Sequence, residues 1–164
     1  MKGFLFIVFV SLFLSSPKLK EVRIDYVKAV NNKEITLQLN ENLSGISKAD
    51  NKILVAYKGA VLTLMAKFAE SRNDKKEYFK LGATLLNYAV SEKPNNVEIR
   101  CIRLGVQENA PKVVGYRKNK AEDKQFILKH YNAIPSKEVK NVIKNFVLHS
   151  KSFSEEEKSL FNKK

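Results

Sequence analysis

Residues 50–72 have the sequence DNKILVAYKGAVLTLMAKFAESR, and this stretch decides the fold class. Its apolar residues recur at intervals of three and four, which is the period of an α-helix. They mark one face at Ile53, Tyr57, Ala60, Val61, Leu64 and Phe68, which is widened by Val55, Leu62 and Met65. An apolar stripe of this width indicates a helix that is buried between neighbouring helices. The small residues Ala56, Gly59 and Ala60 would let another helix approach closely.

Helical periodicity continues on both sides of this stretch. Before it, residues 17–47 carry two further apolar faces with the same period. After it, Asp74 followed by Glu77 has the pattern of a helix N-cap, and Ser154 followed by Glu157 repeats that pattern near the C-terminus. The chain contains only 6 Gly and 4 Pro in 164 residues, which favours helices joined by short connections.

The predicted fold is therefore all-α, with seven or eight helices in antiparallel pairs. Residues 17–164 form a single helical domain in this prediction, with N-terminal helices in 17–47 and three helix pairs in 50–162. The predicted pairs are 50–72 with 75–92, 96–108 with 111–131, and 137–150 with 155–162. Stacked pairs of this kind form either a small solenoid or an irregular bundle. The polar middle of 111–131 leaves two alternatives, one long helix that projects into solvent or a split near Asn119.

The N-terminus has the pattern of a secretory signal peptide. Lys2 is followed by an apolar run from Gly3 to Leu14, which is too short to cross a hydrocarbon core of about 30 Å. We therefore expect a signal peptide over residues 1–16 and an exported protein, periplasmic or secreted. Leu14 and Pro17 fit a cleavage site poorly, so cleavage stays open, and an uncleaved segment would anchor the chain in the membrane. The alternative, a buried N-terminal helix, would need a larger domain to enclose it.

The chain is strongly basic, with 30 Lys and Arg against 17 Asp and Glu and a net charge of +13. Such a surplus is typical of proteins that bind an anionic membrane surface, an acidic partner or nucleic acid. The candidate anion-binding surface comprises Lys112, Arg117, Lys118, Lys120, Lys124, Lys137, Lys140 and Lys144. The alternative is an ordinary solvated helix face. Nucleic acid ranks last as a partner, because the arginines are scattered and no aromatic residues alternate with the basic ones.

The sequence contains no catalytic or metal-binding motif. His130 and His149 have no Cys, His or carboxylate at a metal-ligand spacing, and no glycine-rich nucleotide loop or GxSxG motif occurs. Cys101 is the single cysteine and lies in an apolar helical run, which predicts a buried thiol and excludes an internal disulfide. We therefore expect no catalytic residues, no cofactor and no metal, and a protein that is not an enzyme.

Residues 89–96, AVSEKPNN, resemble the end of a tetratricopeptide repeat. Ala89 and Pro94 match that family in type and spacing, and Gly82 matches the small residue one helix face earlier. The resemblance covers about residues 63–108, and it lacks the Trp and the Leu-Gly pair that are usual in the first helix of the repeat. The chain as a whole is similar to small exported helical proteins of Bacteroidetes-type bacteria. The repeat resemblance implies a scaffold that binds a protein or peptide, without chemistry.

The sequence supports three functional hypotheses. The first is an exported helical-repeat module that binds a protein or peptide in an apolar groove between helix pairs. Its candidate groove residues are Tyr57, Tyr78, Tyr88 and Tyr116, because tyrosine is common at interfaces; alternatively these tyrosines belong to the core. The second is a basic membrane-surface protein held by an uncleaved N-terminal segment. The third is an enzyme of unfamiliar type, which would need ionisable side chains that the fold brings together in a pocket.

Overall fold

The computed structural model describes residues 18–162, and in this part of the chain every regular element is a helix. The α-helices are α1 (Leu19–Ala29), α2 (Lys33–Asn42), α3 (Lys52–Phe68), α4 (Arg72–Glu92), α5 (Val97–Asn109), α6 (Lys120–His130), α7 (Lys137–His149) and α8 (Glu155–Leu160), with 3₁₀ helices η1 (Lys112–Val114) and η2 (Tyr131–Ala133). The all-α prediction and the expected number of helices are confirmed.

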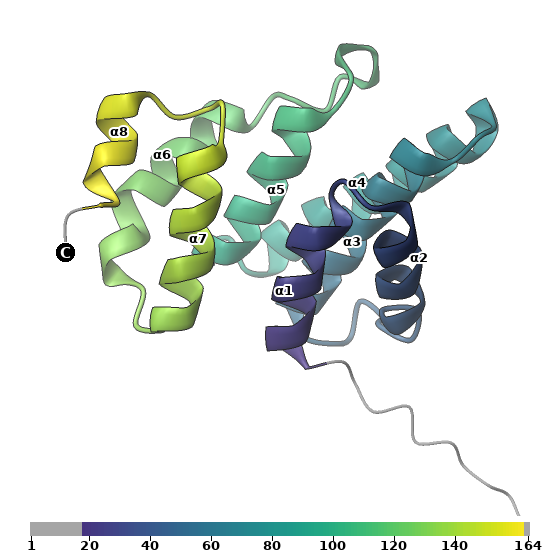
Figure 1. Cartoon of the computed structure of the whole chain (residues 1–164), viewed down its shortest axis with the longest axis horizontal. Coiled ribbons are helices and arrows are strands. Elements are labelled where there is room, and N and C mark those ends of the chain that lie inside the picture. Colours follow the sequence, from purple (N-terminus) through teal and green to yellow (C-terminus); the bar gives the residue numbers. More distant parts are fainter. Residues whose placement is uncertain (1–17, 163–164) are drawn as a thin grey trace, which may run out of the picture.

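The molecule has two ends that are joined through α5. Figure 1 shows α1–α4 at one end, α6–α8 at the other, and α5 between them. The predicted signal peptide, residues 1–16, lies outside the described residues. Within residues 18–162, none of the helices combines the length and the apolar character needed to cross a membrane.

Helices α3 and α4 pack with their backbones in contact at two glycines. A Cβ atom on Gly59 would lie 2.7 Å from the carbonyl oxygen of Gly82, and a Cβ atom on Gly82 would overlap the carbonyl oxygen of Gly59. Close-packed interiors do not accommodate such an overlap, so neither position has room for a side chain. The close approach predicted from the small residues of α3 is therefore confirmed at Gly59.

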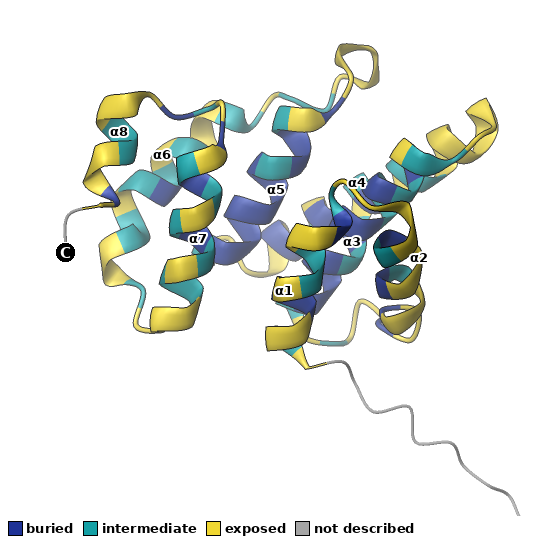
Figure 2. Cartoon of the chain, viewed as in Figure 1, coloured by how far each residue is buried: buried dark blue, intermediate teal, exposed yellow. Residues whose placement is uncertain are grey.

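The apolar interior consists of two clusters that share α5 as a wall. The first cluster lies among α1–α5 and includes Val22, Leu39, Val55, Tyr57, Val61, Leu86, Ile99 and Ile102. The second lies among α5–α8 and includes Cys101, Leu104, Ile127, Ile143, Val147, Phe153 and Phe161. Two faces of α5 thus serve two different clusters. Figure 2 shows α5 as largely buried, because neighbouring helices cover both of these faces.

The helix packing follows two of the predicted pairs. α4 packs along α3, and α6 packs against α5. Residues 111–131 do not form one long helix but are divided near Asn119, which is the second of the two alternatives that the sequence left open. Gly115 ends η1 with a φ of +64°, a left-handed conformation that glycine adopts readily, and α6 begins only at Lys120, directly after Asn119. The loop of residues 110–119 therefore stands where part of a helix was expected.

The third predicted pair is built differently. α8 has only 6 residues, and aromatic side chains attach it to the rest of the protein. Phe153, which follows α7, packs edge-on against Phe146 and Phe161 with ring centroids 6.5 and 6.1 Å apart. Phe161 also packs on Tyr131, with ring centroids 4.4 Å apart. These contacts anchor the C-terminal end of the described chain in the second apolar cluster.

Side-chain caps fix the starts of α4 and α8. The cap predicted at Ser154 is confirmed, because Ser154 and Glu157 form a complete capping box. The cap predicted at Asp74 is wrong: α4 begins at Arg72, and the Ser71 hydroxyl accepts a hydrogen bond of 3.0 Å from the backbone N–H of Asp74. The carboxylate of Asp74 instead lies in the first turn, where the helix dipole favours negative charge. As a result, α4 begins earlier than predicted, and a longer exposed segment precedes its first buried residue.

Replacing Gly82 with Ala is expected to destabilise the protein by about 2–3 kcal/mol, because the added methyl group must push α3 and α4 apart. Gly45→Ala is the matched control, since a Cβ atom there meets nothing within 4 Å. Urea denaturation followed by circular dichroism would give the free energy of unfolding of each variant. Equal stability of the two variants would contradict the backbone contact between α3 and α4.

Candidate functional site

Tyr57, one of the four tyrosines expected at a groove, lies in the core. It is only 2% exposed. Its ring packs edge-on against Tyr26 with centroids 5.4 Å apart, and its hydroxyl donates a hydrogen bond of 3.1 Å to Oε1 of Glu98. Burial, together with the negative charge of Glu98, raises the pKa of Tyr57 well above its ordinary value. Tyr57 is therefore a core residue, as the alternative interpretation of the tyrosines predicted, and it is not part of a partner surface.

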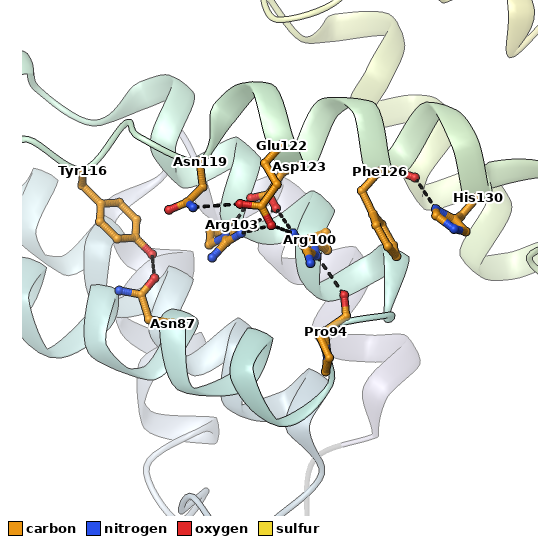
Figure 3. Close-up of polar contacts among 10 residues, drawn as sticks. All are labelled: Asn87, Pro94, Arg100, Arg103, Tyr116, Asn119, Glu122, Asp123, Phe126 and His130. Atoms are coloured by element: carbon orange, nitrogen blue, oxygen red, sulfur yellow. Dashed lines mark hydrogen bonds and ion pairs between the residues drawn. The ribbon is translucent and has the colours of Figure 1, made fainter.

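Tyr88 and Tyr116 hold loops against α4. The Tyr88 hydroxyl donates a hydrogen bond of 3.3 Å to the carbonyl of Lys48, whose ammonium group lies 4.9 Å from the centre of the Tyr88 ring. The Tyr116 hydroxyl donates a hydrogen bond of 2.9 Å to Oδ1 of Asn87 (Figure 3). The Tyr116 ring also packs edge-on against Phe79, with centroids 5.8 Å apart, and burial raises the pKa of Tyr116 to about 12. Both tyrosines are half-buried and already bonded within the chain.

Tyr78 lines a surface hollow. The hollow lies between α2, the end of α3 and the start of α4, and we call it the α2–α4 hollow. Its lining comprises Lys33, Leu37, Met65, Phe68, Ala69, Glu70, Asp74 and Tyr78. The apolar members come from all three helices or their ends, and the charged members carry both signs. Because Tyr57 is buried and Tyr88 and Tyr116 hold loops, the four tyrosines do not form one groove.

The predicted basic residues divide into two groups. Those of the first group are on α7 and on α6 beyond its first residue, and two of them hold the C-terminal helices together. Lys124 pairs with Glu157 at 2.8 Å, and Lys140 donates a hydrogen bond of 3.1 Å to the carbonyl of Asn132. The members of this group are Lys124, Lys137, Lys140 and Lys144.

The second group of basic residues surrounds the loop of residues 110–119. Arg117 crosses the base of this loop and donates from Nε to the carbonyl of Ala110 at 2.9 Å. Within residues 18–162, no carboxylate pairs with the other members of the group. Those other members are Lys112, Lys118 and Lys120.

A buried arginine that the sequence analysis did not single out joins three helices. Arg23 on α1 donates from Nε and Nη2 to both carboxylate oxygens of Glu98 on α5, at 2.7 and 2.8 Å. Its Nη1 donates to Oε1 of Glu138 on α7 at 2.8 Å. The hydrogen bonds to Glu98 raise the pKa of Arg23. A paired geometry of this kind fixes the relative orientation of α1 and α5.

A second buried ion-pair network joins α5 to α6 (Figure 3). Asp123, which is 0% exposed, accepts from Nε and Nη2 of Arg103 at 2.7 and 2.6 Å, and from Nη1 of Arg100 at 3.0 Å. Arg100 also bonds Glu122, and its guanidinium lies 4.6 Å from the centre of the Phe126 ring. The hydrogen bond from Arg100 lowers the pKa of Glu122, so this carboxyl stays ionised and is a poor proton donor near neutral pH.

The two histidines close the ends of their own helices. Nδ1 of His130 lies 2.9 Å from the carbonyl oxygen of Phe126, and Nδ1 of His149 lies 2.8 Å from that of Asn145. Figure 3 shows the His130 ring beyond Phe126, pointing away from the ion-pair network. In the part of the chain that the structure describes, no group of three or more His, Cys, Asp or Glu side chains could hold a metal ion.

Replacing Asp123 with Asn is expected to cost about 3–5 kcal/mol, because Arg100 and Arg103 would lose the carboxylate that compensates their buried charge. The substitution preserves the shape of the side chain, so lost charge is the main effect. Glu155→Gln removes an ion pair with Lys158 whose carboxylate is on the surface, and this control should leave stability unchanged within error. Urea denaturation would give the free energy of unfolding of both variants, which should fall for Asp123→Asn and not for Glu155→Gln. A mild effect of Asp123→Asn would show that the network is not a structural requirement.

Cys101 is expected to be unreactive in the folded protein. Its thiol is buried, as the sequence predicted, and burial raises its pKa well above the ordinary value. Alkylation by iodoacetamide at mildly alkaline pH, followed by mass spectrometry, should be slow until urea unfolds the chain. Rapid alkylation of the native protein would contradict the packing of α5 against α7.

Models of protein families, curated proteins and solved structures give no match to this chain.

Proposed function

We propose that the chain is an exported, non-enzymatic helical scaffold that binds a protein or peptide partner in the α2–α4 hollow. The observation that carries this proposal is the composition of the hollow. Apolar side chains from α2, α3 and α4 meet there at the surface, and residues of both charge signs accompany them. Interface centres typically combine aromatic and aliphatic anchors with a polar rim, which is the composition found here.

The start of α4 makes these anchors available. None of residues 72–81 is buried, and the first buried residue of α4 is Gly82, where the helix meets α3. Tyr78 therefore lies on a part of α4 that precedes its buried residues. Leu37, across the hollow on α2, is 46% exposed. Large apolar side chains that stay in water contribute little to the stability of the fold. A partner that covers them removes apolar surface from water, which favours binding.

The lining favours a partner segment with apolar side chains on one face. Leu37, Phe68 and Tyr78 offer an apolar contact area, and Lys33 and Asp74 can bond either sign of charge or a peptide backbone. An amphipathic helix that lays its apolar face into a groove uses side chains of this kind. The occupant we propose is therefore an amphipathic segment of a partner protein.

The resemblance to a tetratricopeptide repeat supports the same function. Gly82, which carries part of the resemblance, lies at the contact between α3 and α4, and Ala89 is fully buried. Pro94 follows the end of α4 at Glu92. Proteins built from such repeats use stacked helix pairs as surfaces for peptides and partner proteins, and we propose that this chain does so with α2, α3 and α4.

A photo-crosslinking phenylalanine derivative at position 78 is expected to capture the partner in cells that export the protein. The same derivative at position 160, on the exposed Leu160 of α8 at the opposite end of the molecule, is the matched control (Figure 1). Adding Leu37→Asp should lower the crosslinked yield at position 78 at least about tenfold, because it places a charge in the apolar lining. Mass spectrometry of the crosslinked product would identify the partner.

Equal capture from positions 78 and 160, or capture at position 78 that Leu37→Asp leaves unchanged, would contradict the proposed site.

Mass spectrometry of the purified exported protein would determine its N-terminal residue. A start near Pro17 would agree with the predicted signal peptide, and a start at Met1 would instead favour membrane anchoring.

A further inference from the structure

The loop between α5 and α6, residues 110–119, carries two aliphatic side chains that the core does not use. Val113 is 92% exposed, and its neighbour Val114 is 42% exposed. Figure 1 shows this loop projecting from the body of the molecule beside the C-terminal end of α5. Single exposed apolar residues are ordinary, but two consecutive ones at the tip of a projecting loop need an explanation other than folding.

The loop is held in place at its base. Tyr116 bonds Asn87 at 2.9 Å and packs on Phe79, both on α4, so the loop is fastened to a second helix. Arg117 bonds the carbonyl of Ala110 and thereby closes the base of the loop. The Val113 side chain is thus presented from a fastened loop, which reduces the conformational entropy lost on binding.

The charge around the tip is positive. Lys112 precedes the two valines, and Lys118 and Lys120 follow Tyr116 and Arg117. The nearest acidic residue that follows in sequence, Glu122, is bonded by Arg100 and by Nδ2 of Asn119, the latter at 2.9 Å (Figure 3). The loop and the first residue of α6 therefore combine two exposed aliphatic side chains with three lysines that no carboxylate of residues 18–162 pairs with.

We propose that this loop docks on an anionic phospholipid bilayer, with Val113 and Val114 entering the interfacial layer and the lysines contacting lipid headgroups. Apolar insertion and electrostatic attraction are each weak alone, and stable attachment to a membrane surface takes both. A projecting tip fits a deformable surface, whereas a protein hot spot is a packed pocket. A single-stranded nucleic acid typically stacks its bases on exposed aromatic rings, and the ring of Tyr116 is already packed on Phe79.

This contact is distinct from anchoring by the N-terminal segment. Figure 1 shows the start of α1 at the opposite side of the molecule from the loop. It is also distinct from the α2–α4 hollow, because no residue of 110–119 lines that hollow. The proposal can therefore fail or succeed independently of the proposed partner binding.

The test places an environment-sensitive fluorophore on the full chain through Val113→Cys, with Cys101 left in place because its thiol is buried. The matched control carries the same fluorophore through Leu160→Cys, at an exposed apolar position on α8. Each protein is mixed with vesicles of neutral phosphatidylcholine or of phosphatidylcholine with phosphatidylglycerol. We expect a blue shift of the emission at position 113 on the anionic vesicles only, and none at position 160.

Two further variants test the two components of the contact on the anionic vesicles. Val114→Asp in the protein labelled at position 113 should weaken binding about tenfold, because it replaces an inserting side chain by a charge that repels the lipids. Lys118→Ala should weaken binding about fivefold, the loss expected for one lysine near an anionic surface.

The proposal is overturned by any of four results. The first is an unchanged emission at position 113, and the second is an equal shift at positions 113 and 160, which would indicate attachment through another part of the chain. The third is an equal shift on neutral and anionic vesicles, since the lysines would then have no role. The fourth is a blue shift at position 113 that only a partner protein causes, since that protein and not a lipid surface would then contact the loop.

Discussion

The burial of charged side chains along α5 is the constraint on which the arrangement of the other helices depends. Glu98, Arg100 and Arg103 are enclosed because α5 is covered on two sides, and each needs an opposite charge at hydrogen-bond distance. Arg23 on α1 and Asp123 on α6 supply those charges. Such pairs add little net stability over apolar packing, but separating them leaves an uncompensated buried charge. Arrangements that move α1 or α6 away from α5 are therefore strongly disfavoured.

The two proposed contact surfaces share a single turn of α4, which directly precedes the first buried residue of that helix, Gly82. Tyr78 lines the α2–α4 hollow, and the next residue, Phe79, supports Tyr116 at the base of the loop. The backbone contact between Gly59 and Gly82 holds α4 against α3 directly beyond this turn. One helix pair thus contributes to both surfaces, while ion pairs attach α6 to α5 and α7 to α1.

Most helices, and two of the three helix pairs, could be predicted from the sequence, because apolar spacing, small residues and caps are local signals. Apolar spacing identified α3, the small residue Gly59 indicated a close helix approach, and Ser154 with Glu157 marked the start of α8. The ion pairs could not be predicted, because Arg23 and Glu98 are 75 residues apart and no spacing rule connects them. Tyrosine type alone likewise could not distinguish a core residue from a surface one. The pair Val113 and Val114 appeared to continue a helix, although Gly115 directly after it was the available signal for a turn.

The position of Glu98 in the chain also affects how the protein is assembled. Synthesis delivers a polypeptide in order from its N-terminus, so α1–α4 are made before the carboxylate that Arg23 requires. Until that carboxylate arrives, Arg23 has no counterion on α5 and Tyr57 lacks its hydrogen-bond acceptor. Stable closure of the first apolar cluster is thereby postponed until α5 has been made.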